Sequence, residues 1–165
     1  MAKKKIITNA MRMLNAAKIP FEAIEYDGEG LLDGDGFGSA VAELTGVPSE
    51  SSYKTLVARG EKNGIMVCCI PVDEECDLKK LAKACGDKKV ELTHVKELLS
   101  LTGYIRGGVS PIGMKKKYPT YIDESCLEFK KIAVSAGVCG CTLLMKPDDV
   151  IKVTDATVVD LVKEN

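Results

Sequence analysis

A glycine-rich segment is the stretch of this sequence best suited to chemistry by the backbone itself. Residues 103–116 read Gly-Tyr-Ile-Arg-Gly-Gly-Val-Ser-Pro-Ile-Gly-Met-Lys-Lys, so four glycines and one proline interrupt an apolar run. Glycine permits positive φ and close approach, which lets unpaired N–H groups face a small polar ligand. The plainer interpretation is a tight bend between two strands, and composition alone favours that bend. Only the rest of the chain can support a ligand site.

Lys54 is the side chain that fits its predicted surroundings least well. Alternation along a strand over residues 53–58 places Lys54 on the same apolar face as Leu56 and Ala58. Its ammonium group could reach solvent at the strand end, which is the commoner case, or face an anionic or hydroxyl-bearing ligand. Thr55 offers a hydroxyl on the opposite face. Ser135, at the end of another apolar strand, could bring a further hydroxyl to the same opening, although small residues after a strand usually form a turn.

Other catalytic signatures are missing from the sequence. The single histidine, His94, lies between a predicted strand and a predicted helix, and without a G-x-S-x-G motif a serine triad has no support. Phosphate-loop and dinucleotide glycine patterns are also absent. The seven cysteines form no C-x-x-C pair, so we expect no metal site and no cofactor. Their odd number and irregular spacing favour reduced thiols that pack as small core residues.

Composition indicates one ordinary domain covering residues 1–165. Hydrophobic residues make up 45% and charged residues 28% of the chain, which is enough for an aliphatic core. Lys and Arg total 23 against 24 Asp and Glu, so the overall charge attracts neither DNA nor an anionic membrane. A polyanion would have to be met locally, for example by the lysines at 115–117. Because no apolar run reaches the length of a membrane span, we expect a cytoplasmic protein.

Local patterns predict the elements that position these residues. Strands are predicted over 21–26, 53–58, 65–72, 120–123, 131–134 and 141–145; helices over 5–18, from Ser39 as N-cap to Gly46, over 78–84 after Asp77, over 95–101, and briefly from Pro147. A long glycine-rich loop over 27–38 carries Phe37 at its end. The strand over 65–72 is apolar on both faces and should be central. Together they favour an α+β domain with a mixed curved sheet or barrel and flanking helices.

Several separated motifs, in order along nearly the whole chain, resemble the YbaK/EbsC family of aminoacyl-tRNA deacylases. They are Lys54-Thr-Leu-Val, the glycine segment, Leu127-Glu-Phe with Val134-Ser-Ala-Gly137, and the closing Pro147-Asp-Asp-Val. The resemblance implies a YbaK-like domain that acts in trans on cysteine mischarged onto tRNA(Pro). Its expected partners are that tRNA and, as a candidate for delivery, prolyl-tRNA synthetase. A deacylase for another small amino acid such as alanine, and a non-catalytic tRNA- or synthetase-binding module, remain alternatives.

The resemblance also assigns residues to the site. It implies a catalytic role for Lys54 and for the backbone N–H groups at Gly107 and Gly108, and substrate binding by Tyr26, Phe37, Thr55 and Ser135. In such enzymes the thiol of the substrate cysteine attacks its own ester carbonyl, which would explain why the sequence shows no protein nucleophile. The chain departs from the family at Val138-Cys139, where relatives often carry basic residues, so a nucleic-acid contact expected there would be lost or moved.

Overall fold

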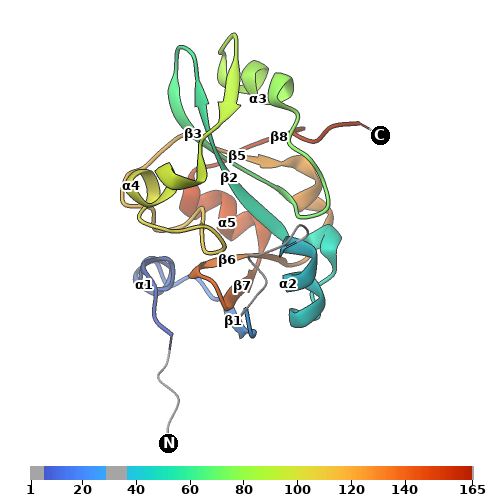
Figure 1. The fold of residues 1–165 in the computed structure, drawn as a ribbon. Coiled ribbons are helices and arrows are strands. Elements are labelled where there is room, and N and C mark those ends of the chain that lie inside the picture. The colour runs from blue at the N-terminus through green and yellow to red at the C-terminus, as the bar shows by residue number, and fades with distance from the viewer. Residues whose placement is uncertain (1–5, 29–36, 165) are drawn as a thin grey trace, which may run out of the picture.

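The computed structural model describes residues 6–28 and 37–164, which form two β-sheets with helices packed around them (Figure 1). The α-helices in this part of the chain are α1 (Asn9–Ala16), α2 (Phe37–Thr45), α3 (Leu78–Cys85), α4 (Leu98–Thr102) and α5 (Pro147–Thr154), and the short 3-10 helices are η2 (Ser49–Ser51), η3 (Val95–Glu97) and η4 (Glu124–Glu128). The strands are β1 (Glu22–Glu25), β2 (Tyr53–Gly60), β3 (Gly64–Pro71), β4 (Val90–Leu92), β5 (Thr120–Asp123), β6 (Ile132–Val138), β7 (Cys141–Met145) and β8 (Thr157–Val159).

The strands are divided between two sheets that meet at one point. The larger sheet has the order β4-β2-β3-β5-β8, with antiparallel pairing in the β2–β3 hairpin and parallel pairing of β5 with β3 and β8. The smaller sheet is antiparallel, in the order β1-β7-β6. A bridge between Ser52 and Ala133 connects them at the start of β2. The predicted α+β class with a mixed sheet and flanking helices is confirmed.

Strand β3 occupies the centre of the larger sheet, as its apolar character predicts. Neighbouring residues on a strand point to opposite faces, and here the two faces belong to different cores. Cys68 and Ile70 pack in a core with Leu81 of α3, whereas Cys69 packs in the core that contains Ile122 of β5. Burial on both faces is the physical reason for the unbroken apolar run of this strand.

Helix boundaries follow local capping chemistry, with one correction. Asp77 caps α3 as predicted, because its carboxylate accepts hydrogen bonds from the N–H groups of Lys79 and Lys80, and Gly86 ends the helix at φ 73°. The prediction for Ser39 is wrong: α2 begins at Phe37, and the Ser39 hydroxyl donates to the carboxylate of Asp73 instead of capping the helix. None of the helices in the described residues is long and apolar enough to span a membrane.

The interpretation of the glycine segment as a bend between two strands is also wrong. The segment follows α4 and precedes β5, and most of it forms neither helix nor strand. In Figure 1 this region passes beside β6 and below the β2–β3 hairpin. It can therefore present backbone groups to the space between the two sheets.

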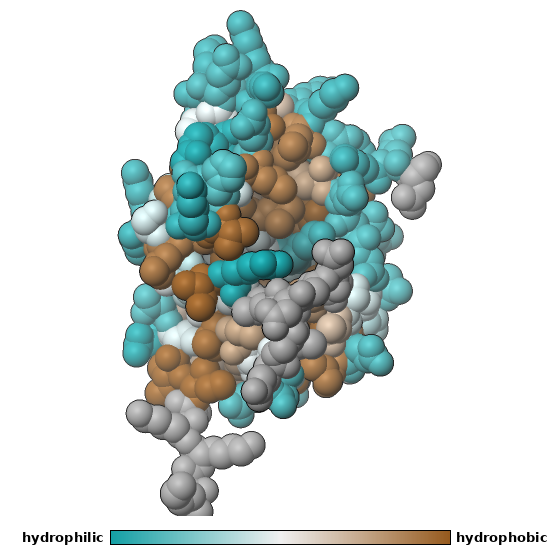
Figure 2. All heavy atoms as spheres, in the orientation of Figure 1, coloured by the Kyte–Doolittle hydropathy of each residue, from teal (hydrophilic) through white to brown (hydrophobic). Residues whose placement is uncertain are grey.

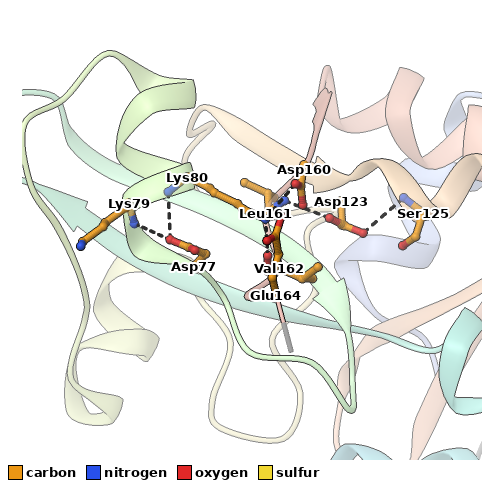
Figure 3. Close-up of polar contacts among 9 residues, drawn as sticks. All are labelled: Asp77, Lys79, Lys80, Asp123, Ser125, Asp160, Leu161, Val162 and Glu164. Atoms are coloured by element: carbon orange, nitrogen blue, oxygen red, sulfur yellow. Dashed lines mark hydrogen bonds and ion pairs between the residues drawn. The ribbon is translucent and has the colours of Figure 1, made fainter.

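The C-terminal segment is tied to the larger sheet by polar contacts (Figure 3). Asp123, only 3% exposed, accepts a hydrogen bond from the backbone N–H of Leu161 at 2.9 Å. The ammonium of Lys80 contacts the carboxylate of Asp160 at 2.8 Å and the carbonyl oxygen of Val162 at 2.7 Å. These contacts hold residues 160–162 against α3 and the end of β5.

Candidate active site

A cavity of about 470 Å³ lies between β2, β6, α2 and the glycine segment. Six of the seven site residues predicted from sequence line it: Tyr26, Phe37, Lys54, Thr55, Gly107 and Ser135. They come from five separate parts of the chain, so only the fold brings them together. Gly108 is the exception and does not line the cavity.

An unpaired stretch of the β2 edge forms one wall of this cavity. Strand β4 pairs with β2 only from Ala58 to Gly60, and β6 meets β2 only through the Ser52 bridge. The carbonyl of Ser52 accepts a hydrogen bond from the N–H of Val72. In an antiparallel pair every second residue forms such hydrogen bonds with its partner strand, so the backbone N–H and C=O of Thr55 point away from β3. Within the described part of the chain, no strand pairs with Thr55 on that side. Its backbone can therefore form hydrogen bonds with a ligand in the cavity.

Lys54 is half-buried in the same wall, so it is not simply extended into solvent. Its backbone pairs with Ile70 of β3, which fixes where the side chain starts. None of the ion pairs found among the described residues involves Lys54. Glu75 interacts with the positive charge of Lys54 only from beyond ion-pair distance. The ammonium group is therefore not held by a carboxylate in this part of the structure, and it can act on a ligand that carries negative charge.

The two adjacent glycines have different structural roles. Residues 105–108 form a turn in which the N–H of Gly108 donates to the carbonyl of Ile105 at 2.9 Å, and Gly107 has φ 87°. Gly107 lines the cavity, and its own N–H has no hydrogen-bond partner among the described residues. The N–H of Gly108 is occupied by the turn, so in this structure it is not directed at a ligand, and the catalytic role of Gly108 stays a prediction.

Gly108 instead allows close packing between backbone segments. A Cβ at this position would lie 2.8 Å from the Cα of Val138, so any side chain would push the glycine segment away from the β6–β7 turn. Tyr104 of the same segment packs against Gly137, the residue next to Val138. Its hydroxyl donates to the carbonyl of Ile112 at 2.7 Å. Its ring packs so close to Gly137 that a Cβ on Gly137 would lie only 2.7 Å from the Tyr104 Cε1. These contacts fix the position of Gly107 relative to β6.

Ser135 and Tyr26 lie on opposite sides of the β6–β7 turn. The Ser135 hydroxyl accepts from the N–H of Gly137 at 3.1 Å, at a point where the pairing of β6 with β7 shifts register. The backbone N–H of Tyr26 donates to the carbonyl of Gly140 at 2.9 Å, and burial raises the pKa of its phenol, so the hydroxyl stays protonated at neutral pH. Both hydroxyls are thus available as neutral hydrogen-bonding groups.

Sequence reasoning missed several residues that line the cavity. Arg106 is exposed at the cavity beside Gly107 and has no ion pair within the described chain. Its place between an apolar residue and two glycines was a signal that could have identified it. Thr142 is buried, and its hydroxyl donates to the carbonyl of Val134 at 2.8 Å. Cys141 also lines the cavity, but burial raises the pKa of its thiol, which makes it a poor nucleophile.

The family model for the aminoacyl-tRNA editing domain matches residues 38–153, which include most of this cavity. The chain belongs to the aminoacyl-tRNA editing domain family. The predicted relationship to YbaK/EbsC proteins, and with it the class of aminoacyl-tRNA deacylases, is confirmed. The assignment of individual site residues stays a prediction.

Individual relatives agree with this membership. EbsC of Enterococcus faecalis, a proposed Cys-tRNA(Pro)/Cys-tRNA(Cys) deacylase, is 44% identical over 164 residues, covering 98% of each chain. A proline–tRNA ligase of Brachyspira hyodysenteriae is 32% identical over 77 residues, which are 47% of this chain and 13% of the ligase. A crystal structure of a proposed trans-editing enzyme for prolyl-tRNA synthetase superposes with a TM-score of 0.79 at 22% identity, covering 97% of this chain and all of that one, and supports the fold.

Substitution of Gly108 by alanine tests whether its close packing against the β6–β7 turn positions the cavity wall. Gly108→Ala is expected to lower the free energy of unfolding by about 1–3 kcal/mol, because the added methyl group must displace backbone atoms. It should also lower deacylation, since Gly107 moves with the segment. Chemical denaturation and a deacylation assay measure the two effects.

Gly86→Ala provides the matched control. Unlike Gly108, Gly86 has positive φ, but a Cβ there meets nothing within 4 Å, and it ends α3 away from the cavity. This variant should lose about 1 kcal/mol of stability and keep its activity. Equal activity in both variants would contradict the role of Gly108 in placing the cavity wall.

Proposed function

We propose that this protein removes cysteine from mischarged Cys-tRNA(Pro), acting in trans in the cytoplasm. The observation that carries the proposal is the joint presence in one cavity of Lys54 and of the Thr55 backbone and the Gly107 N–H, both of which lack partners among the described residues. The 44% identity to EbsC over nearly the full length supports the choice of cysteine and tRNA(Pro). Prolyl-tRNA synthetase is the candidate partner for delivering the substrate.

The cavity contains groups that could position an aminoacyl ester. The N–H of Gly107 would face the carbonyl oxygen, where negative charge develops as the ester carbon becomes tetrahedral. Lys54 would bind the terminal adenosine or its phosphate, and Thr55 would pair with the substrate through its backbone. An aminoacyl ester is already activated, so positioning and charge stabilisation contribute most of the acceleration.

The cavity lining provides no evident attacking group. None of the serine and threonine hydroxyls among its described residues is hydrogen-bonded to a histidine or a carboxylate that could remove its proton; these residues are Thr45, Ser52, Thr55, Thr93, Ser135 and Thr142. Cys141 is held in the thiol form by burial. These observations favour attack by a group that the substrate itself supplies.

The thiol of the substrate cysteine is such a group. Its sulfur would form a bond to its own ester carbonyl carbon while the bond from that carbon to the ribose oxygen breaks. The thiol proton passes to the departing ribose oxygen, which becomes a hydroxyl group, and the products are uncharged tRNA and a cyclic thiolactone. Water then opens the thiolactone to give free cysteine.

Phosphate contacts would come from exposed cationic side chains in and directly after the glycine-rich segment. Arg106 is exposed at the cavity lining, and Lys115–Lys117 are exposed at the end of the segment, where Lys117 also forms an ion pair with Asp155 at 3.8 Å. Lys116 lies 5.9 Å from the ring centroid of Tyr118, which limits the positions that its side chain takes. These cations would bind the acceptor end without reading its sequence, so affinity should fall as salt rises.

The deciding experiment compares Cys-tRNA(Pro) with Ala-tRNA(Pro) at equal enzyme concentration. We expect rapid release of cysteine and release of alanine at about the uncatalysed rate, because alanine has no thiol to attack the ester. The readout is radiolabelled amino acid remaining on tRNA over time. Preference for alanine would assign the protein to a different editing specificity, and no release of either would favour a binding module.

A further inference from the structure

Two thiols outside the cavity lie unusually close together. The Sγ atoms of Cys68 and Cys76 are 3.7 Å apart, and the two residues are 0% and 9% exposed. Cys68 is on β3, and Cys76 lies between β3 and α3, directly before the capping Asp77. A disulfide requires about 2.0 Å between the sulfur atoms, so the gap must close by about 1.7 Å.

The surroundings of the pair make the two thiols chemically different. The hydrogen bond with Cys68 lowers the pKa of Cys76, and the positive charges of Lys54 and Lys163 act in the same direction, against burial and the carboxylate of Asp77. The same hydrogen bond, together with burial, raises the pKa of Cys68. Cys76, which keeps some exposure, is therefore the thiol that reacts first with an oxidant, and Cys68 is the neighbouring thiol that can resolve the product.

We propose that Cys68 and Cys76 form a reversible disulfide that lowers the activity of the editing site when peroxide is present. The thiolate of Cys76 attacks one oxygen of hydrogen peroxide, and the O–O bond breaks. The other oxygen departs as hydroxide, and Cys76 becomes a sulfenic acid. The sulfur of Cys68 then attacks the Cys76 sulfur, forming the S–S bond and releasing the sulfenic oxygen as water. Overall, two thiols and one hydrogen peroxide give one disulfide and two waters, and a dithiol reductant reverses the change.

The segment that carries Cys76 also forms part of the cavity. Val72, four residues earlier, lines the cavity. It lies so close to Gly38 of α2 that a Cβ on Gly38 would be only 2.7 Å from the Val72 Cβ, so α2 packs directly on Val72. The next residue, Asp73, accepts the hydrogen bond from Ser39 of α2. A movement of Cys76 toward β3 therefore acts on the wall made by Val72 and α2.

The other side of Cys76 is held by the C-terminal segment, which Figure 3 shows beside Asp77. The N–H of Asp77 donates to the carbonyl of Leu161 at 2.7 Å, and the N–H of Lys163 donates to the carbonyl of Glu75 at 3.0 Å. These backbone bonds resist movement of α3 and its cap. The displacement that closes the disulfide is then transmitted mainly toward Val72 and the cavity.

The test uses the full-length protein, first fully reduced and then treated with hydrogen peroxide. Trypsin leaves residues 63–79 as one peptide, and a glutamate-specific protease cuts that peptide between Cys69 and Cys76. We expect the oxidised sample to show these fragments joined, with a mass lower by two hydrogen atoms than the sum of the free peptides. Deacylation should fall roughly tenfold or more, because small displacements of a site wall have large effects on rate, and should return with dithiothreitol.

Three variants identify the pair. Cys76→Ser and Cys68→Ala should remain active and lose the response to peroxide. Cys69→Ala is the matched control, because Cys69 is the sequence neighbour of Cys68 but points into the opposite core; it should form the disulfide and respond like the unmodified chain. A response that persists in Cys76→Ser, or linked fragments without any change in rate, would overturn the proposal.

The effect on rate rests on the proposed deacylase function, so a second measurement separates the two. Hydrogen exchange in residues 37–45 should increase on oxidation if the disulfide displaces the segment beneath α2. A reduced protein that fails to release cysteine would refute the deacylase function alone, while linked fragments with faster exchange would still support the switch. Absence of linked fragments would refute the switch whatever the activity.

Discussion

Replacing Lys54 with alanine is expected to lower the rate of Cys-tRNA(Pro) deacylation by a factor on the order of 100, because a charged hydrogen bond contributes about 1.5–3 kcal/mol. Among the described residues no carboxylate lines the cavity or forms an ion pair with Lys54, although Glu75 interacts with its charge from beyond ion-pair distance. The charge of Lys54 is therefore available to the substrate. Single-turnover deacylation with enzyme in excess measures the loss without a contribution from product release.

Two further variants separate a role in the site from a role in folding. Lys62→Ala removes an exposed lysine at the far end of the same hairpin, outside the cavity, and should leave the rate unchanged. Lys54→Arg keeps the charge but changes its shape and reach, so it should recover part of the activity at most. Thermal unfolding of Lys54→Ala should match the unmodified chain closely. Unchanged turnover in Lys54→Ala would remove this residue from the site.

The parts of the fold that depend on local chemistry could be predicted from sequence. The β2–β3 hairpin follows from two apolar segments around an Asn63-Gly64 turn, and α3 follows from its Asp77 cap and Gly86 stop. The start of α2 could not be predicted in this way. Ser39 has the composition of an N-cap, but its hydroxyl is used by Asp73, a residue 34 positions away that is near only in the folded chain.

The same distinction applies to the candidate site. Lys54 stood out because a lysine interrupts an apolar strand face, and the glycine segment stood out by composition. The role of Gly108 depends on the backbone of Val138 and Cys139, and the open backbone of Thr55 depends on where β4 stops pairing with β2. Neither condition is encoded near the residue concerned, so sequence patterns could not reveal it.

Blocking the thiol of the esterified cysteine is expected to lower deacylation by a factor on the order of 100 or more. An attacking group in the same molecule as its target has a very high effective concentration, and the cavity lining offers no equally activated replacement. The substrate for this test is Cys-tRNA(Pro) alkylated on sulfur with a methyl group, which adds little volume. Ser-tRNA(Pro) gives a second comparison, because a hydroxyl of similar size is a far weaker nucleophile than a thiol at neutral pH.

The control in this experiment is binding, which thiol chemistry should not require. S-methylated Cys-tRNA(Pro) should inhibit hydrolysis of the normal substrate, because Gly107 and Lys54 would still contact the ester and the terminal nucleotide. Inhibition without turnover would show that the enzyme positions a reaction that the substrate carries out. Turnover of the methylated substrate near the normal rate would contradict that account and require a water molecule activated by the protein. Attention would then move to Ser135 and Thr142, the buried or half-buried hydroxyls that line the cavity beside β6.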